Sequence, residues 1–392
     1  MKIGRIFQLT FWKAVAIILM ALGLVAAVER YSQGLGATTN LKDTFPWGLW
    51  IGFDILVGVG LAAGGFVIAA TVYVFNIERF RPILRPTVLT AFLGYLLVIA
   101  GLMVDLGRPW AIWHAIIMWN PHSVMFEVAW CVMLYTTVLA LEFSPVVLER
   151  FNLQRPLRLI KAITIPLVIL GVILSTLHQS SLGSLFLIIP GRMHPLWYSD
   201  IIPFLFIISC VAAGLAMTIF ESFLSSRSFG KEVELPLLTE LAKVLVVVLA
   251  LFFTVRIQDL MNRDALQYVF QPTYQSAMFL GEITLGVILP FFLLLNKKIR
   301  NSKAGLFYSS VLVILGFVAH RLNTAITSME SWPDRVYLPS WQELTITAGL
   351  VAFGFTAFAL ASRYFNVFGH GTEPEPKSHE VREHTEAAAM AK

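Results

Sequence analysis

Long apolar stretches separated by short polar connections run along almost the whole of this 392-residue chain. A helix needs about 20 mainly apolar residues to cross a bilayer. Ten stretches approach or exceed this length, at residues 11–28, 50–76, 86–106, 123–143, 159–178, 201–223, 241–260, 276–296, 305–323 and 344–365. The pattern predicts an all-α polytopic membrane protein with about ten transmembrane helices.

The two ends of the chain need separate interpretation. The first stretch follows Lys2, Arg5 and Lys13, as a signal peptide would, but it lacks a small-residue cleavage site and ends at Glu29 and Arg30. We therefore expect a retained helix. The segment 369–392 is polar and contains proline, so we expect a disordered tail.

Composition and charge agree with this class. The chain is 57% hydrophobic and 14% charged, with a mean hydropathy of +0.75, which excludes a soluble domain of this length. Of the 29 Lys and Arg residues, 21 fall on the side of the predicted topology that carries both termini. The positive-inside rule makes that side cytoplasmic, so we expect a bacterial inner-membrane protein. The net charge of +5 is a topology signal and gives no reason to expect nucleic acid as a partner.

Ionisable residues lie inside the apolar stretches, where charge is costly and usually serves a function. They are Asp54, Asp105, Glu127, His178, Glu221, Arg256, Asp259, Glu282, His320 and Arg321. Asp54 shares a helical stripe with Gly58 and Gly65. Small residues let helices approach closely, so Asp54 should face protein and not lipid.

The same stripe argument applies to Asp105, Glu127, His178 and Glu221, each of which shares a face with small or polar residues. These faces suit a bundle interior. The alternative is a structural ion pair or an end residue that reaches the interface. For Asp105 a local salt bridge with Arg108, three residues on, is an equally good explanation.

The depths of these groups suggest a route for protons. At 1.5 Å per residue, Glu221 lies near the cytoplasm, Tyr95 near mid-membrane and Glu127 near the outer surface. A file of Glu221, Tyr95, Glu127 and His178 would cross most of the bilayer. Alternatively, Glu221 anchors its helix at the interface and Tyr95 only packs.

The predicted outer loops combine Trp with His, Asp and Arg, as in 105–110 and 194–197. Trp alone is typical of the aromatic belt at a membrane interface. The added polar groups favour a docking platform or a site for an amphipathic ligand.

Resident metals are not expected. The two cysteines, Cys131 and Cys210, are isolated within spans, which excludes an iron–sulfur cluster. Only His178 and His320 belong to spans, both at outer ends, so paired haem ligands across the membrane are not expected. The sequence has no phosphate-binding loop and no hydrolase or zinc-protease motif. Any electrons must come from a partner.

Several motifs resemble the NrfD/polysulfide-reductase membrane-subunit family. The most specific are Phe-Pro-Trp-Gly at 45–48, continuing to Asp54, and His-Gln-Ser-Ser at 178–181. The segments 92–95, 105–108, 123–127, 194–197 and 220–222 add weaker matches. Within the family, the likeness is greatest to the hydrogenase-2 membrane subunits that are called cytochrome b.

The resemblance implies a fold and a partner. It implies two four-helix bundles with flanking helices, divided as 1–44 (first helix), 45–200 and 201–330 (bundles), 331–368 (last helix) and 369–392 (tail). It implies a quinone, menaquinone or ubiquinone, near the outer face. The expected partners are a periplasmic, ferredoxin-like iron–sulfur subunit and a catalytic subunit pair, a NiFe hydrogenase in the nearest branch.

The predicted site combines the resemblance with the chemistry of the residues. A quinone oxygen that gains charge needs a proton or hydrogen-bond donor, which His178 can supply. We expect Asp54 to hold the imidazole or deliver a second proton, and Trp47 and Trp50 to flank the ring. The predicted quinone-binding residues are Trp47, Trp50, Asp54, Asp105, Arg108, His178 and Gln179; the predicted proton pathway is Tyr95, Glu127 and Glu221.

Two other functions remain open. A secondary transporter would also bury charges, but no obvious pair of interrupted helices is present. A passive membrane anchor would leave Asp54, Glu127 and His178 without a role.

Overall fold

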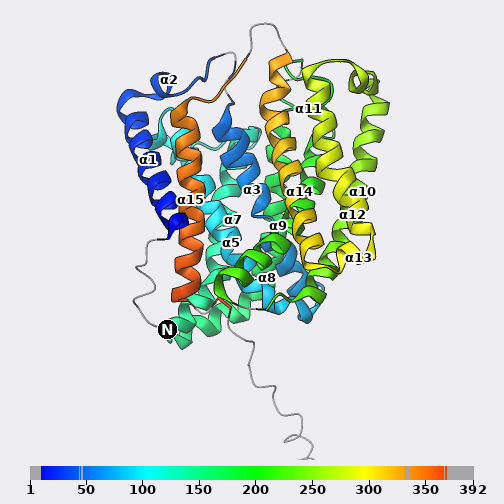
Figure 1. Ribbon diagram of the computed structural model, residues 1–392. Helices are drawn as coiled ribbons and strands as arrows, with labels where there is room; N and C mark the ends of the chain where they lie inside the picture. The colour runs from blue at the N-terminus through cyan, green and yellow to red at the C-terminus, as the bar shows by residue number, and fades with distance from the viewer. Residues whose placement is uncertain are drawn as a thin grey trace, which may run out of the picture.

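The computed structural model describes residues 10–43, 45, 47–189, 191–230, 232–331, 336–365 and 367–368. Within these residues, ten helices are long and apolar enough to cross a membrane. All ten predicted spans have a counterpart among them, so the all-α polytopic fold is confirmed (Figure 1). The predicted tail at 369–392 lies outside the described residues.

Six spans are single continuous helices. They are α1 (Phe11–Gln33), α7 (Val124–Arg150), α8 (Gln154–Ser184), α9 (Ile202–Phe229), α10 (Leu235–Asn262) and α15 (Trp341–Tyr364). A seventh, α5 (Arg81–Asp105), follows the short turn η4 (Glu78–Phe80). Short helices α2 (Leu35–Thr38), α6 (His114–Ile117) and α13 (Lys297–Arg300) lie between spans, as do the turns η5 (Pro109–Ala111), η6 (Ala265–Phe270) and η9 (Met329–Ser331).

The other three spans contain π-helical turns. The second span comprises η2 (Trp50–Val57), α3 (Gly58–Leu61), α4 (Gly64–Ala69) and η3 (Ala70–Val74), with η2 and η3 in π geometry. The eighth comprises α11 (Tyr274–Ile283), the π turn η7 (Thr284–Ile288) and α12 (Leu289–Leu295). The ninth is α14 (Lys303–Leu322), continued by the π turn η8 (Asn323–Thr327). Such turns often mark functional sites.

Several helices extend beyond the apolar stretches that predicted them. The fifth span was expected from residue 159, yet α8 begins at Gln154. Its first turns carry Arg155 and Arg158, which lowered the hydropathy there although the helix continues. Because long cationic side chains can reach water from a helix end, an apolar window underestimates helix length.

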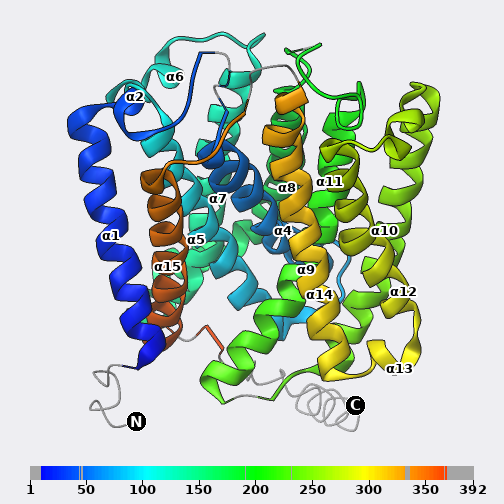
Figure 2. The same cartoon turned by 45° about the horizontal axis from the view of Figure 1, so that its top comes forward.

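The spans pack in two groups and a flanking pair. The second span packs with α5, which contacts α7, and α7 contacts α8; we call this group the first bundle. Helices α9, α10, α11–α12 and α14 contact one another and form the second bundle. Helix α1 packs on α15 along one side of the molecule (Figures 1 and 2).

The two bundles meet through small residues on the second span and on α9. A Cβ atom added to Gly64 would lie 2.8 Å from Thr218 Oγ1 and 3.0 Å from Gly214 O. One added to Gly214 would lie 2.7 Å from Gly64 N. Only glycine permits backbones this close, so these two residues fix the distance between the bundles.

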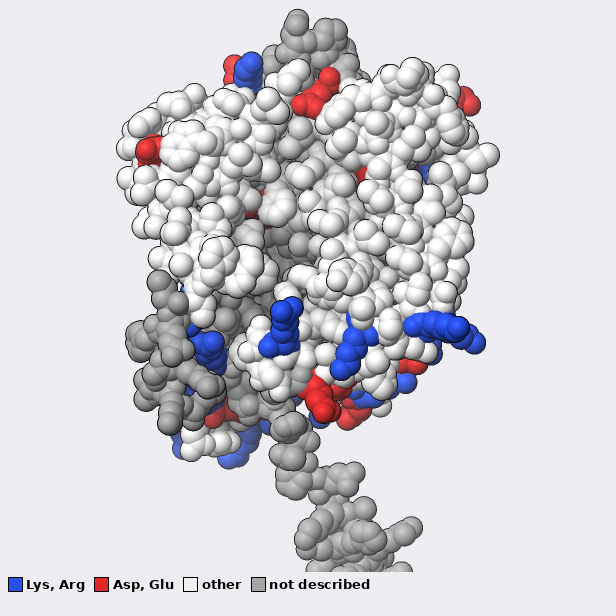
Figure 3. Space-filling model, in the orientation of Figure 1, with Lys and Arg blue, Asp and Glu red and all other residues white. Residues whose placement is uncertain are grey.

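The two faces of the molecule differ in charge. Helices α1, α5, α8 and α10 all end at the same face of the molecule, which is at the top in Figure 1 and which we call the upper face. The opposite face, where these helices begin, is the lower face. In Figure 3, Lys and Arg side chains gather along the lower edge, beneath a broad uncharged belt. This is the distribution expected of a protein that crosses a membrane.

Hydrogen bonds join the upper ends of the helices. Helix α15 begins with a capping box, in which Ser340 Oγ accepts from Glu343 N at 3.1 Å and Glu343 Oε2 accepts from Ser340 N at 2.8 Å. The Tyr337 hydroxyl also donates to the Glu343 carboxylate. Burial and this neighbouring carboxylate raise the pKa of Tyr337, so its proton stays in place as a donor. Arg30 Nε donates to Val104 O at 2.7 Å and ties α1 to α5.

Candidate functional site

A tyrosine and a histidine pair inside the first bundle. Tyr95 on α5 and His178 on α8 are both fully buried. The Tyr95 hydroxyl lies 2.9 Å from His178 Nδ1, within hydrogen-bond distance. The other ring nitrogen, Nε2, is buried and has no hydrogen-bond partner among the described residues. A buried polar atom without a partner costs free energy, so Nε2 is a candidate contact for a ligand.

Next to His178, Gln179 meets an arginine from the second bundle. Arg321 NH2 donates to Gln179 Oε1 at 3.4 Å, to Ser209 Oγ at 3.1 Å and to Phe206 O at 3.1 Å. Its guanidinium carbon lies 3.5 Å from the centroid of the Phe206 ring. Gln179 Nε2 and Arg321 Nε and NH1 have no partner within the described part of the chain. Donors are therefore in excess here, as an acceptor ligand such as a carbonyl oxygen requires.

Asp54 faces protein, as its helical stripe predicted. It is 8% exposed, and its Oδ2 accepts from Thr347 Oγ1 on α15 at 2.7 Å. A Cβ atom added to Gly101 would lie 2.8 Å from Asp54 Cβ, so α5 covers its other side. The expectation that Asp54 holds the His178 imidazole is wrong, because Tyr95 occupies Nδ1 and Asp54 is turned toward α15.

The other predicted quinone residues are spread over the upper part of the first bundle. Trp47 is half-buried and packs edge-on against Phe186, with ring centroids 5.4 Å apart. Trp50 is 1% exposed and packs in an apolar cluster with Ala26, Val104 and Ile346, toward α1 and α15.

Asp105 and Arg108 are not a pair in this structure. Asp105 is half-buried at the end of α5, where Arg30 is the nearby cation. Arg108 is exposed. Among the ion pairs of the described residues, none within 4.0 Å joins these two side chains, so the alternative of a local salt bridge is wrong.

Only part of the predicted proton pathway lies in the interior of the protein. Glu221 is 8% exposed and lines the interior near Thr90, as predicted. Within the described residues, neither carboxylate oxygen of Glu221 has a hydrogen-bond partner, and neither does the Thr90 hydroxyl. Glu127, in contrast, is exposed, so the expectation that it lines the bundle is wrong. It lies in the first turn of α7, where a carboxylate complements the unpaired N–H groups of the helix and needs no partner inside.

Sequence reasoning missed Glu142 and Tyr135, on the face of α7 that meets α8. Tyr135 is 1% exposed and packs edge-on against Tyr95, with ring centroids 4.7 Å apart. A Cβ atom added to Gly171 would lie 3.2 Å from Glu142 Oε1 and 3.6 Å from Tyr135 Cε2. The sequence contained a signal that could have identified them. Glu142 follows Tyr135 by seven residues, which is two helical turns and places both on the same face of the helix.

The comparisons with known proteins agree with the resemblance seen in the motifs. Residues 37–329 match the family described as polysulphide reductase, NrfD. A protein of Nitratidesulfovibrio vulgaris is 39% identical over 366 residues, covering 90% of this chain and 93% of that protein. The probable Ni/Fe-hydrogenase 2 b-type cytochrome subunit of Escherichia coli K12 is 33% identical, covering 93% and 94%. The integral membrane subunit of a menaquinone reductase of Nitratidesulfovibrio vulgaris is 28% identical, covering 92% of each.

The name of the Escherichia coli relative implies a haem, which the histidines of this chain do not fit. Both span histidines are buried, at 0% exposure for His178 and 4% for His320, so a haem would need space inside the bundles. The His320 ring packs between Phe206 and Phe252, at centroid distances of 6.0 and 5.6 Å. A macrocycle on Nε2 would have to displace these rings. Taken together, the buried polar groups, the ten spans and the family match over most of the chain show that it belongs to the polysulphide reductase NrfD family.

Proposed function

We propose that this chain is the quinone-reactive membrane subunit of a respiratory redox complex. In this proposal it passes electrons between an iron–sulfur subunit of a periplasmic hydrogenase module and quinone in the bilayer. Two relatives support it, since one is named as a hydrogenase subunit and the other as a subunit of a menaquinone reductase. The relative named as a hydrogenase subunit is 33% identical and the menaquinone-reductase subunit is 28% identical, which supports a hydrogenase as the proposed partner.

The observation that carries the proposal is the orphaned Nε2 of His178. A quinone accepts two electrons and two protons at its carbonyl oxygens. Within the described residues, His178 offers one buried ring nitrogen without a hydrogen-bond partner, and Gln179, the next residue in the chain, offers an unpartnered side-chain N–H group. These are the donors that a carbonyl oxygen requires as it gains charge.

Tyr95 sets the state of the histidine. When the Tyr95 hydroxyl donates to Nδ1, the proton of the neutral imidazole resides on Nε2, which then faces the ligand as a donor. This tautomer is assigned from the hydrogen bond. Tyr95 and His178 therefore keep a proton on His178 Nε2, from which a reduced quinone oxygen would take it.

The upper face is the proposed docking side for the electron-transfer partner. By the positive-inside rule the lower, Lys- and Arg-rich face is cytoplasmic, so the upper face is periplasmic. Between α5 and α7 that side carries Trp110, Trp113 and Trp119, which are 71%, 51% and 66% exposed. Aromatic residues on an exposed surface are typical of protein interfaces, and His178 lies within two turns of the upper end of α8.

Protons for the reaction are proposed to enter from the cytoplasmic side. Glu221 and Glu142 both lie in the lower half of their helices and face the interior. Tyr135 and Tyr95 lie between Glu142 and His178. Because the electrons arrive at the opposite face, proton uptake by this route moves charge across the membrane. Each elementary charge corresponds to about 2.3 kcal/mol per 100 mV.

Purification of the intact complex tests the proposal. The complex is expected to contain iron–sulfur and nickel-containing subunits and to reduce 2,3-dimethyl-1,4-naphthoquinone with hydrogen as the donor. A secondary transporter would purify without such subunits. A passive anchor would give a complex that reduces dyes but not quinone, and either result contradicts the proposal.

A further inference from the structure

A buried carboxylate in the second bundle has no role in the proposed quinone reaction. Glu282 on α11 is 4% exposed. Its Oε2 accepts from Trp197 Nε1 at 3.0 Å and from Asn323 Nδ2 at 2.8 Å. Its Oε1 lies 2.8 Å from His320 Nδ1. Four side chains thus converge here, from α11, α14, η8 and the segment before α9.

His320 repeats the arrangement of His178 with a different partner. Its Nδ1 is held by a carboxylate and not by a phenol. Its Nε2 is buried and lacks a hydrogen-bond partner among the described residues. A carboxylate on Nδ1 stabilises an imidazolium ion, because the charged ring then lies beside an opposite charge.

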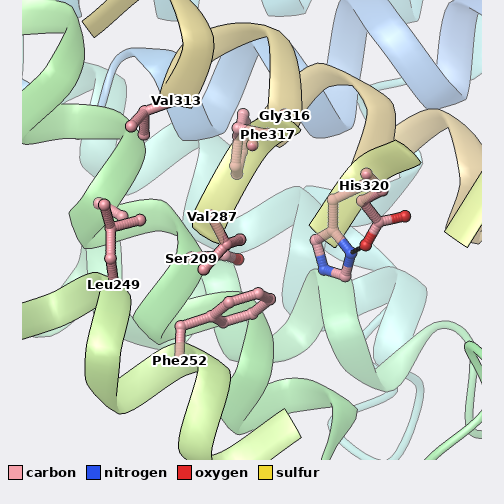
Figure 4. A pocket seen from close by; sticks show the side chains of 11 residues that line it. Ser209, Leu249, Phe252, Val287, Val313, Gly316, Phe317 and His320 are labelled. Carbon is pink, nitrogen blue, oxygen red and sulfur yellow. Dashed lines mark hydrogen bonds and ion pairs between the residues drawn. The ribbon is translucent and has the colours of Figure 1, made fainter. Parts of the chain in front are cut away.

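A cavity of about 30 Å³ lies against this pair. Ser209, Glu282 and His320 supply its polar lining, and Leu249, Phe252 and Val313 are among its apolar walls. In Figure 4, His320 lies at the opposite end of the cavity from Leu249 and Val313. A buried water needs about 10–15 Å³ of such space and two or more polar partners, so both conditions are met for at least one water molecule.

One π-helical turn lines the cavity, and a second contributes to the Glu282 cluster. Turn η7 (Thr284–Ile288) begins two residues after Glu282 and contributes Gly286 to the cavity wall. Turn η8 (Asn323–Thr327) begins three residues after His320 and contributes Asn323 to the Glu282 cluster. Such turns shift the register of a helix and cost stability, so they often mark functional sites.

Charged and titratable groups on neighbouring helices surround His320. Burial opposes a proton on the imidazole most strongly, Glu282 on α11 favours it, and Arg321 on α14 and Arg256 on α10 oppose it. Asp259, also on α10, is engaged by Arg263 at 2.7 Å and by Ser199 at 2.6 Å. Cys210 lies on α9, next to Ser209 in the cavity wall. The Glu282 carboxylate favours binding of a proton at His320, and the two arginines favour its release.

We propose that His320 and Glu282 form a second proton-exchange site, served by water in this cavity and separate from the quinone site. A hydronium ion in the cavity transfers one proton to His320 Nε2 and leaves a water molecule. The imidazolium keeps its Nδ1 hydrogen bond to the Glu282 carboxylate, which balances the charge. Release returns the proton to water by the reverse transfer, so no other reactant is consumed.

Arg321 connects this site to the first bundle. It follows His320 in the sequence, and its NH2 contacts Ser209 in the cavity wall and Gln179 beside His178. A change of charge at one site therefore acts on an arginine shared with the other. The role of the site in quinone turnover rests on the proposed function; its hydration and proton exchange do not.

Radiolytic footprinting of the purified complex tests whether the cavity holds water. Hydroxyl radicals formed from bound water should oxidise Phe252 and Phe317, which line the cavity. Ala212→Leu fills the cavity from α9 and should abolish that labelling. The same exchange at exposed Ala21 on α1 should leave it unchanged. Absence of labelling at both rings in the unmodified protein means a dry cavity and overturns the proposal.

Infrared titration of the complex with ring-labelled histidine tests proton exchange without quinone. His320→Gln should remove one titrating imidazole from the pH-difference spectrum, and Glu282→Gln should shift that signal to lower pH. Tyr31→Phe on α1 is the control, since Tyr31 lies outside the Glu282 cluster and its hydroxyl donates to Met103 O. Spectra of His320→Gln that match the unmodified protein overturn the proposal, even if the complex reduces quinone as expected.

Proteoliposomes test whether the site acts during turnover. With hydrogen as donor and 2,3-dimethyl-1,4-naphthoquinone as acceptor, His320→Gln should lose part of the charge moved per electron while quinone reduction continues. Tyr31→Phe should keep the unmodified ratio. An unchanged ratio in His320→Gln removes the site from the coupled reaction. A complex that titrates as expected but reduces no quinone contradicts the proposed function alone.

Discussion

The Tyr95 hydroxyl lies 2.9 Å from His178 Nδ1, although 83 residues separate them in the chain. The contact joins α5 to α8 in the interior of the first bundle. It fixes the orientation of the imidazole and leaves Nε2 as the atom available to a ligand. A neighbour at one ring nitrogen orients the imidazole and leaves the other nitrogen for a ligand, so the tyrosine acts on the ligand through the histidine.

Tyr95→Phe should lower quinone turnover without abolishing it. The phenylalanine ring fills the same place, but Nδ1 loses its partner and the imidazole loses the hydrogen bond that orients it. Removing the orienting partner of a metal-bound histidine costs about 10- to 100-fold, and we expect a loss of that size here. Hydrogen-dependent quinone reduction by the purified complex gives the measurement. Tyr31→Phe on α1 serves as the control, because its hydroxyl bonds only the exposed backbone oxygen of Met103.

Tyr95 and His178 also show what the sequence revealed and what it did not. The polar residue types and their depths were readable, because helical periodicity places each side chain on a face. Which faces meet was not readable, since it depends on how the helices rotate against one another. Asp54 was correctly assigned to the protein interior, yet it turns to Thr347 on α15 and not to His178.

Glu127 and Glu142 illustrate the same limit on α7. Glu127 was chosen because it shares a stripe with Cys131, which is indeed buried. The stripe enters the bundle only after the first turn of the helix, so Glu127 is exposed and Glu142, further along, faces α8. Glu142 was missed because it sits at the predicted end of its span, where an acidic residue is easily explained as interfacial.

Substitution of the acidic residues should separate the proton routes. Glu142→Gln and Glu221→Gln each remove a carboxyl group from the lower half of the interior, so both should lower the membrane potential formed per electron in proteoliposomes. Glu127→Gln should leave it unchanged, because water already reaches this exposed side chain. A full potential in both interior variants would exclude a route through these residues.

Gly316→Val should destabilise the second bundle. A Cβ atom at Gly316 would lie 2.1 Å from Gly286 Cα, so α14 and η7 cannot keep their distance. Overpacking of this kind costs about 1–3 kcal/mol or more, which should lower the thermal midpoint of the complex in detergent. Gly281→Val is the matched control, since nothing lies within 4 Å of a Cβ atom there. Equal midpoints for the two variants would show that the close approach is absent.

The purified subunit, separated from its partners, should show no Soret band and no stoichiometric iron. The reason is the close packing around the span histidines, since both are buried and the His320 ring lies between Phe206 and Phe252. Absorption spectroscopy with metal analysis provides the check, and the hydrogenase-associated subunit of Escherichia coli is the natural comparison because of its name. A haem spectrum retained by this chain alone would overturn our assignment of the histidines.

Quinone turnover of His178→Ala is the most direct test of the quinone site. The variant removes the buried Nε2 donor, so hydrogen-dependent reduction of 2,3-dimethyl-1,4-naphthoquinone should be lost while hydrogen-dependent dye reduction by the same complex continues. His122→Ala, in an exposed position of the upper loop, should retain both activities. The account predicts this selective loss; quinone turnover at the unmodified rate in His178→Ala would contradict it.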